Sequence, residues 1–401
     1  MNFVIFFSTI GAKLSNKIPT SSVPYGEYLN GIWSQKSFFL SPTDEHEIAK
    51  IILGLKNKYS TGYDEMSNVL LKKLIPEICH PLSVIFNKSL SEGIVPKAMK
   101  LADVLPIFKS KDSSVCSNYR PISLLPVVSK VLERVVYTRL YNFLQKEQLL
   151  YNSQYGFRTK HSTINAITEF VGKVLNGFEN DQYTLSIFLD LSKAFDTIDH
   201  NIMLHKLNTY GIRGCANNWF KSYLSNRQQQ VKYNSGVRSN PMWVTCGVPQ
   251  GSVLGPLLFI LYTNDIYKSL ANSECILFAD DTTIFKANKD INELIEFVKG
   301  DMNILIDWFR ANKLSLNLSK TNCILFKPKH KKIDDIVLSF GSENLRSTQS
   351  TKFLGLIIDE NLTWSSHIKH ISLKLSKGLY TLRSVRNCLP NWTKRMLYMS
   401  F

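Results

Sequence analysis

The sequence predicts an α+β fold in which helices pack against a small antiparallel sheet. Two strand patterns support this prediction. The apolar run 183–189 ends at Asp190, which is typical of a buried strand followed by a polar site. The segment 274–285 has two short apolar halves that flank Asp280-Asp281, which is the pattern of a β-hairpin.

Helices and further strands are expected on both sides of this hairpin. Ser41 can cap a helix and Pro42 suits a first helical position, so a helix is expected to start there. Apolar spacing indicates the remaining elements. Helices are expected at 67–92, 122–144, 163–177 and 294–311, and short strands at 104–108 and 322–326.

The two ends of the chain carry apolar patterns of different kinds. The opening run 3–10 has no basic residue before it, so we interpret it as the start of a buried helix and not as a signal peptide. The segment 368–382 carries an apolar stripe with basic residues beside it, which predicts a helix packed on the core with a solvated basic face. No run approaches the ~20 apolar residues of a membrane span.

Composition limits the classes of function. The 401 residues suffice for one large core or for two to three smaller ones, and the net charge of +16 favours a polyanionic partner such as nucleic acid. The seven cysteines are scattered without a Cys-x-x-Cys pair, which argues against a zinc finger or a disulfide framework and favours a reducing compartment. We therefore expect an intracellular protein, nuclear or cytoplasmic.

Three aspartates carry the sharpest chemical signal. Asp190 follows a strand, and Asp280 and Asp281 lie at the tip of the expected hairpin. Adjacent carboxylates between apolar strands repel each other unless a cation lies between them. Oxygen ligands of this kind suit Mg²⁺, and two such ions about 3.5–4 Å apart serve nucleotidyl transfer. An isolated Asp-Asp pair is more often a plain polar turn. The surrounding motifs therefore decide whether this pair is a metal site or a turn.

Seven motifs occur in an order that resembles the reverse transcriptases of non-LTR, LINE-like retrotransposons, in particular jockey-like elements. The resemblance covers about residues 100–360. The motifs are Asn118-Tyr119-Arg120-Pro121-Ile122-Ser123, Gln154-Tyr155-Gly156-Phe157-Arg158, Leu189-Asp190-Leu191-Ser192-Lys193-Ala194-Phe195-Asp196, Gly247-Val248-Pro249-Gln250-Gly251-Ser252, Phe278-Ala279-Asp280-Asp281, Asn312-Lys313-Leu314-Ser315-Leu316-Asn317-Leu318-Ser319-Lys320 and Phe353-Leu354-Gly355. Thr263 and the wording around Tyr63 depart from the usual pattern, away from the motif aspartates.

The resemblance implies a right-hand polymerase fold with fingers, a palm built on an antiparallel sheet, and a partial helical thumb. It implies a lead-in segment at 1–40, fingers at 41–180, a catalytic palm at 181–335, and the palm end with a partial thumb at 336–401. Its reaction is the addition of dNTPs to a DNA primer 3′-hydroxyl on an RNA template. No part of the chain resembles an endonuclease domain, so the sequence looks like a fragment of a longer element protein with an incomplete thumb.

The resemblance also implies roles for the metal ligands and the catalytic acid. Asp190 and Asp280 would bind two Mg²⁺ ions with Asp281 in support, and the backbone carbonyl of Leu191 would be a further ligand. Lys320 would protonate the leaving pyrophosphate, although it could be a plain surface lysine.

Five residues would bind the nucleotide. Lys109 and Arg120 would hold the triphosphate, with Lys111 as a competitor for the place of Lys109. Phe195 would exclude a 2′-hydroxyl as a steric gate, unless it is ordinary core. Gln250 and Gly251 would line the nucleotide pocket. Two alternatives stay open: an RNA-templated RNA polymerase, against which Phe195 argues, and a non-catalytic nucleic-acid-binding remnant of a retroelement.

Overall fold

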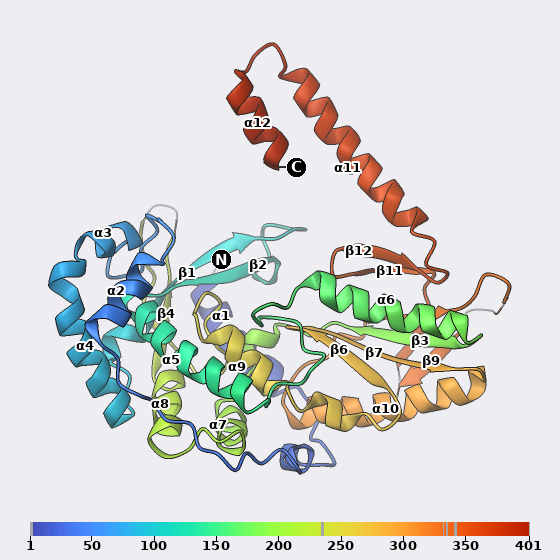
Figure 1. The fold of residues 1–401 in the computed structure, drawn as a ribbon, viewed down its shortest axis with the longest axis horizontal. Coiled ribbons are helices and arrows are strands. Elements are labelled where there is room, and N and C mark those ends of the chain that lie inside the picture. Colours follow the sequence, from blue (N-terminus) through green and yellow to red (C-terminus); the bar gives the residue numbers. More distant parts are fainter. Residues whose placement is uncertain (1–2, 234–235, 332, 334–335, 341–342, 401) are drawn as a thin grey trace.

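The computed structural model describes residues 3–233, 236–331, 333, 336–340 and 343–400. Two four-stranded sheets form the body of the molecule, with strand orders β2-β1-β4-β5 and β6-β7-β3-β8. Helices surround both sheets, and a helical pair extends away from them (Figure 1). The α+β class that the sequence predicts is therefore confirmed.

The second sheet is antiparallel throughout, as expected. Its central strand β3 pairs with β7 on one side and with β8 on the other. Helix α6 (Thr163–Glu179) covers one face, where Phe170 packs against Phe188 and Phe285, and α10 (Ile291–Ala311) covers the other (Figure 1). The strands are β3 (Tyr183–Leu189), β6 (Glu274–Phe278), β7 (Asp281–Asn288) and β8 (Asn322–Phe326).

The first sheet joins segments that are far apart in the sequence. Strand β1 pairs antiparallel with β2 and parallel with β4, which pairs in turn with β5. The strands are β1 (Leu101–Phe108), β2 (Tyr119–Leu124), β4 (Arg227–Val231) and β5 (Met242–Val244). The helix expected at 122–144 was wrong at its start, because 122–124 belong to β2 and α5 (Val127–Lys146) begins only after Pro126.

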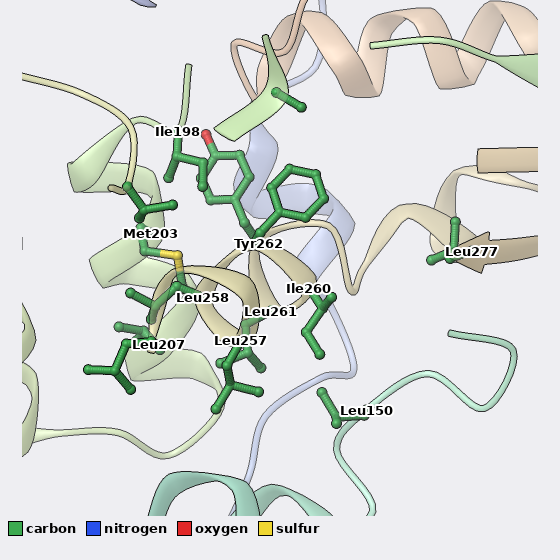
Figure 2. Packing of buried hydrophobic residues seen from close by; sticks show 14 of the residues in the cluster. Leu150, Ile198, Met203, Leu207, Leu257, Leu258, Ile260, Leu261, Tyr262 and Leu277 are labelled. Carbon is green, nitrogen blue, oxygen red and sulfur yellow. The ribbon is translucent and has the colours of Figure 1, made fainter. Parts of the chain in front are cut away.

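Helix α9 (Gly255–Tyr262) lies at the centre of the largest hydrophobic cluster. Its residues Leu257 to Tyr262 are all fully buried, and α7 (His200–Thr209) contributes Met203 and Leu207 to the same cluster (Figure 2). An apolar helix that is buried on every side needs partners on every side. Helices α5, α7, α8 (Gly214–Leu224) and α10 contribute to that surrounding core.

Two helix boundaries differ from the prediction near the N-terminal part. Helix α2 (Glu45–Leu53) begins later than Ser41, because Asp44 is the residue whose carboxylate accepts from the Glu47 amide at 2.7 Å. The helix expected at 67–92 is divided into α3 (Asn68–Lys73) and α4 (Ile75–Glu92). Pro76, at the second position of α4, has no amide hydrogen to continue the preceding helix.

The described residues begin and end in helices. The opening helix α1 (Phe3–Ser15) packs on β4 and β5, as predicted for a buried start. Helices α11 (Ser365–Ser384) and α12 (Asn391–Ser400) extend beyond the body (Figure 1). The stripe on α11 was wrongly expected to be core, because Ile368 is 61% and Leu375 66% exposed. The short strands β9 (Val337–Phe340), β10 (Glu343–Arg346), β11 (Ser350–Phe353) and β12 (Leu356–Asp359) form two hairpins before α11.

All seven cysteines are free thiols in the structure. None of the helices in the described ranges is long and apolar enough to cross a membrane.

Candidate active site

A tight hairpin presents two of the predicted aspartates. Strands β6 and β7 pair with Phe278 opposite Asp281, so Ala279 and Asp280 form the turn between them. Ala279 adopts the left-handed conformation with φ of +57°, which allows the chain to reverse over two residues. The Asp280 and Asp281 side chains are exposed at the tip, while Ala279 is buried below them.

The sheet register places the third aspartate beside this tip. Leu189, the last residue of β3, pairs with Thr282 of β7, so Asp190 leaves the sheet next to Asp281. The Asn317 amide donates to the Asp190 carbonyl at 2.8 Å and the Ser192 amide donates to the Ser315 carbonyl at 2.8 Å. These two bonds fix the end of the strand on either side of Leu191.

The three carboxylates influence one another electrostatically. Partial burial, followed by the charges of Asp280 and Asp190, raises the pKa of Asp281 to about 6. Burial and the charge of Asp190 raise the pKa of Asp280, against the opposing influence of Arg120 and Lys109. A cation among these oxygen donors would relieve the repulsion, so their chemistry fits a divalent ion such as Mg²⁺. Within the described ranges, no three His, Cys, Asp or Glu side chains form a ready-made metal cluster.

A cavity of about 310 Å³ opens beside these aspartates. Its walls come from β1, β2, the segment after β3 and the turn before α9. Eight of the predicted site residues line it: Lys109, Arg120, Asp190, Leu191, Phe195, Gln250, Asp280 and Lys320. Among the other predicted residues, Asp281 lines an adjoining cavity and Gly251 lies behind the first, where a Cβ would come 2.5 Å from the Ser123 carbonyl oxygen.

Basic side chains gather opposite the carboxylates. The ends of β1 and β2 bring Lys109 and Arg120 together, with the Lys109 amide donating to the Asn118 carbonyl at 2.9 Å. Lys320 Nζ lies 3.3 Å from Asp190 Oδ2. Lys111, the competitor of Lys109, is not among the residues that line the cavity. Cations and carboxylates facing each other across one cavity suit a ligand that carries phosphates and a metal.

Residues 107–358 match the model of the reverse transcriptase (RNA-dependent DNA polymerase) family. The chain belongs to the reverse transcriptase family. It is 30% identical to the RNA-directed DNA polymerase from mobile element jockey over 86% of its own length, and 30% identical to the probable RNA-directed DNA polymerase from transposon BS over 91%, both of Drosophila melanogaster. It is 28% identical over 90% of its length to the corresponding protein of transposon X-element from the same fly. The chain spans about two fifths of the length of these curated relatives, 38%, 41% and 40% respectively.

Divalent-metal dependence is general in this family, and the donor set described above is compatible with it. A second cavity, of about 270 Å³, adjoins the first. It shares Asp190 and Lys320 with the first cavity and is closed by the hairpin residues 351–355. The aspartates therefore stand between two openings.

Phe195 is held between two aromatic rings. Its ring stacks on the buried Phe259 at 4.5 Å between centroids, and the edge of Phe157 approaches it at 6.2 Å. The Val248 amide donates to the Phe195 carbonyl at 2.9 Å, which joins Phe195 to the turn before α9. Phe195 thus packs partly against the hydrophobic core and also forms part of the cavity wall. The alternative that Phe195 is an ordinary core residue therefore holds in part.

Sequence reasoning gave no role to two polar residues of the site. Asp196 accepts a hydrogen bond from Gln250 Nε2 at 2.9 Å, and its other oxygen is buried without a partner in the described structure. Burial raises the pKa of this carboxyl. Lys193 lines the cavity and donates to the Tyr119 carbonyl at 3.3 Å. Both residues lie in the motif around Asp190, so the sequence indicated that they are near the site. Their hydrogen-bond partners could not be predicted from the sequence.

Proposed function

We propose that this chain is the RNA-directed DNA polymerase core of a non-LTR retrotransposon protein. It adds dNTPs to the 3′-hydroxyl of a DNA primer on an RNA template. The observation that supports this best is the single cavity in which Asp190 and Asp280 face Lys109, Arg120 and Lys320. A nucleoside triphosphate with bound metal carries the charges that such a cavity complements.

The carboxylate side of the cavity would hold the metals. Asp190 and Asp280 would bind two Mg²⁺ ions with Asp281 in support, and the Leu191 carbonyl would add a ligand. Such ions would supply positive charge that favours ionisation of the primer hydroxyl and stabilises the leaving pyrophosphate. The ion pair between Lys320 and Asp190 keeps a proton donor at the same place, from which Lys320 can protonate the pyrophosphate.

The opposite side binds the nucleotide. Lys109 and Arg120 are exposed at the ends of β1 and β2, where they can hold the triphosphate. Phe195 limits the space below the sugar and excludes a 2′-hydroxyl. Gln250 lines the same wall, and Gly251 with φ of +133° lets the backbone behind it approach Ser123 closely.

For the domains we propose the boundaries that the family resemblance implies. Residues 41–180 serve as fingers, 181–335 as the palm and 336–401 as the palm end with part of a thumb, after a lead-in at 1–40. The cavity beside the hairpin 351–355 is suited to the primer end, because it reaches Asp190 and is not lined by Lys109 or Arg120. Exposed basic residues of α11 can contact the phosphates of the product duplex.

Primer extension on an RNA template with Mg²⁺ tests the proposal. Asp190→Asn and Asp280→Asn should each reduce extension by at least about 10²-fold, since preorganised charge at a reacting centre contributes on that scale. Binding to the primer–template should stay nearly unchanged, because other cations hold the phosphates. A matched control is Asp290→Asn, since Asp290 caps α10 outside the cavity and Asn also caps helices.

Each alternative gives a different result in the same assay. A non-catalytic remnant would bind the primer–template without extending it. An RNA polymerase would use ribonucleotides at least as well as deoxynucleotides. Full activity in Asp190→Asn would remove the metal assignment.

A further inference from the structure

The loop 153–158 is docked directly on the aspartate hairpin. The Leu277 amide donates to the Ser153 carbonyl at 2.9 Å, and the Tyr155 amide donates to the Leu277 carbonyl at 2.8 Å. Gln154 is fully buried, and its side-chain oxygen accepts from the Gly156 amide at 2.7 Å and from the Ala279 amide at 3.3 Å. The loop is therefore fixed to the same turn that carries Asp280.

The residues on either side of Phe157 are fixed as well. A Cβ on Gly156 would overlap the Ala279 backbone, so only glycine allows this contact. Arg158 donates through Nη1 to the Tyr151 carbonyl at 2.8 Å and to the Gln154 carbonyl at 3.1 Å. The backbone at Phe157 is thus held in place through both of its neighbours.

Phe157 itself combines two unusual properties. Its φ is +55°, a left-handed conformation that is uncommon for a bulky residue and costs free energy that the surrounding contacts must offset. Its side chain is 45% exposed, so the conformation does not serve to bury the ring. The ring instead meets Phe195 edge-on, at 6.2 Å and an interplanar angle of 85°.

We propose that Phe157 is a specificity-determining residue that restrains the gate ring of Phe195 from its open side. This rests on the proposed function of the chain. Phe259 supports one face of Phe195 from the core, and Phe157 closes the direction in which the ring could otherwise yield to a 2′-hydroxyl. Sugar selection then depends on the rings of Phe157, Phe195 and Phe259. Of these three residues, only Phe195 lies in the motif around Asp190.

The restraint predicts a measurable but partial effect. An edge-to-face pair of this kind contributes a factor of about 2 to 10 in an equilibrium. Phe157→Ala should therefore raise the ratio of kcat/KM for ribonucleotides to that for deoxynucleotides by about 2- to 10-fold, and by less than Phe195→Ala does. Phe157→Tyr keeps the ring edge and should retain the wild-type ratio.

A double-mutant cycle separates this role from a structural one. Wild type, Phe157→Ala, Phe195→Ala and the double variant are compared by the ratio of ribonucleotide to deoxynucleotide use, which does not depend on the fraction of folded protein. If Phe157 acts through Phe195, its removal changes nothing in the Phe195→Ala background. Phe297→Ala is the matched control, since Phe297 is 36% exposed on α10 and does not line the cavity.

Each outcome of this experiment either supports or overturns the proposed role of Phe157. An unchanged ratio in Phe157→Ala, or the same change with and without Phe195, overturns the proposal. A loss of primer–template affinity with an unchanged ratio also overturns it, and would assign the ring to nucleic-acid contact. If wild type extends no primer at all, the proposed function fails and this inference fails with it, whereas an active wild type with an unaffected ratio removes this inference alone.

Discussion

Replacing Lys206 by Met should destabilise the protein far more than the loss of a surface lysine. Lys206 is fully buried in α7 and donates to Asp265 Oδ1 at 2.5 Å and to the Tyr262 carbonyl at 2.6 Å. The second oxygen of Asp265 accepts from the Trp308 indole N–H at 3.0 Å. The ammonium thus joins α7, the end of α9 and α10, the elements that support the site from behind.

The magnitude follows from what the substitution leaves behind. Removing one partner of a buried ion pair costs about 3–5 kcal/mol, because the remaining charge is uncompensated. Asp265 would keep the Trp308 hydrogen bond, so the lower end of the range, about 3 kcal/mol, is expected here. For cooperative unfolding of a chain of this length, that corresponds to a Tm lower by about 4 °C.

Urea unfolding followed by tryptophan fluorescence measures this effect, with free energies from linear extrapolation. The double variant Lys206→Met/Asp265→Asn removes both charges and keeps an acceptor for Trp308, so it should be more stable than Lys206→Met alone. Lys299→Met is the control, because Lys299 forms an exposed pair with Glu296 worth about 0–1 kcal/mol at most. A Lys206→Met variant within about 1 kcal/mol of wild type, or a double variant no better than the single one, would refute the reasoning.

Two further predictions concern the aspartate hairpin. The pKa of Asp281 is raised to about 6, so its carboxylate, the form that attracts a cation, is lost as the pH falls through that value. At limiting Mg²⁺, the rate of primer extension should therefore rise between about pH 5 and 7. At abundant Mg²⁺, the rate should reach its plateau at a lower pH. A pH–rate profile that is the same at both Mg²⁺ concentrations would contradict this. Gly156→Ala should displace Ala279, abolish primer extension and speed hydrogen exchange at 275–281. The control is Gly172→Ala, because a Cβ there meets nothing within 4 Å. Equal activity of the two variants would count against the contact between Gly156 and Ala279.

The sequence predicted those elements best whose pattern is local. Tyr183–Leu189 and Asn322–Phe326 are strands with the expected bounds, because continuous apolar runs in a sheet covered on both faces leave little choice. The start of α2 was missed because Ser41 and Asp44 are both good caps, and only the Glu47 amide shows which one is used. Residues 122–124, the end of the strand at 119–124, were taken for the start of a helix because the partner strand β1 lies elsewhere in the chain.

The site divides in the same way. The motifs supplied seven of the eight predicted residues that line the cavity, and Lys109 was added by its position before the first motif. The contacts that hold those side chains in place could not be predicted. Gln154 contacts Ala279, and Lys206 contacts Asp265, across 125 and 59 positions respectively, and no periodicity encodes such pairs. The exposed stripe on α11 shows the converse limit, because a pattern suited to burial does not state what covers it.

Helix α1 lies outside the family match but packs closely on the body of the protein. The family match begins at residue 107, yet a side chain on Gly11 would overlap the Asp196 carbonyl, and Phe7 and Ser8 line a small cavity together with Gln250. The first turns of the chain therefore pack behind Asp196 and Gln250, which adjoin the candidate site. A dissection guided by the family match alone would remove this support, so trimming experiments should retain α1 (Phe3–Ser15).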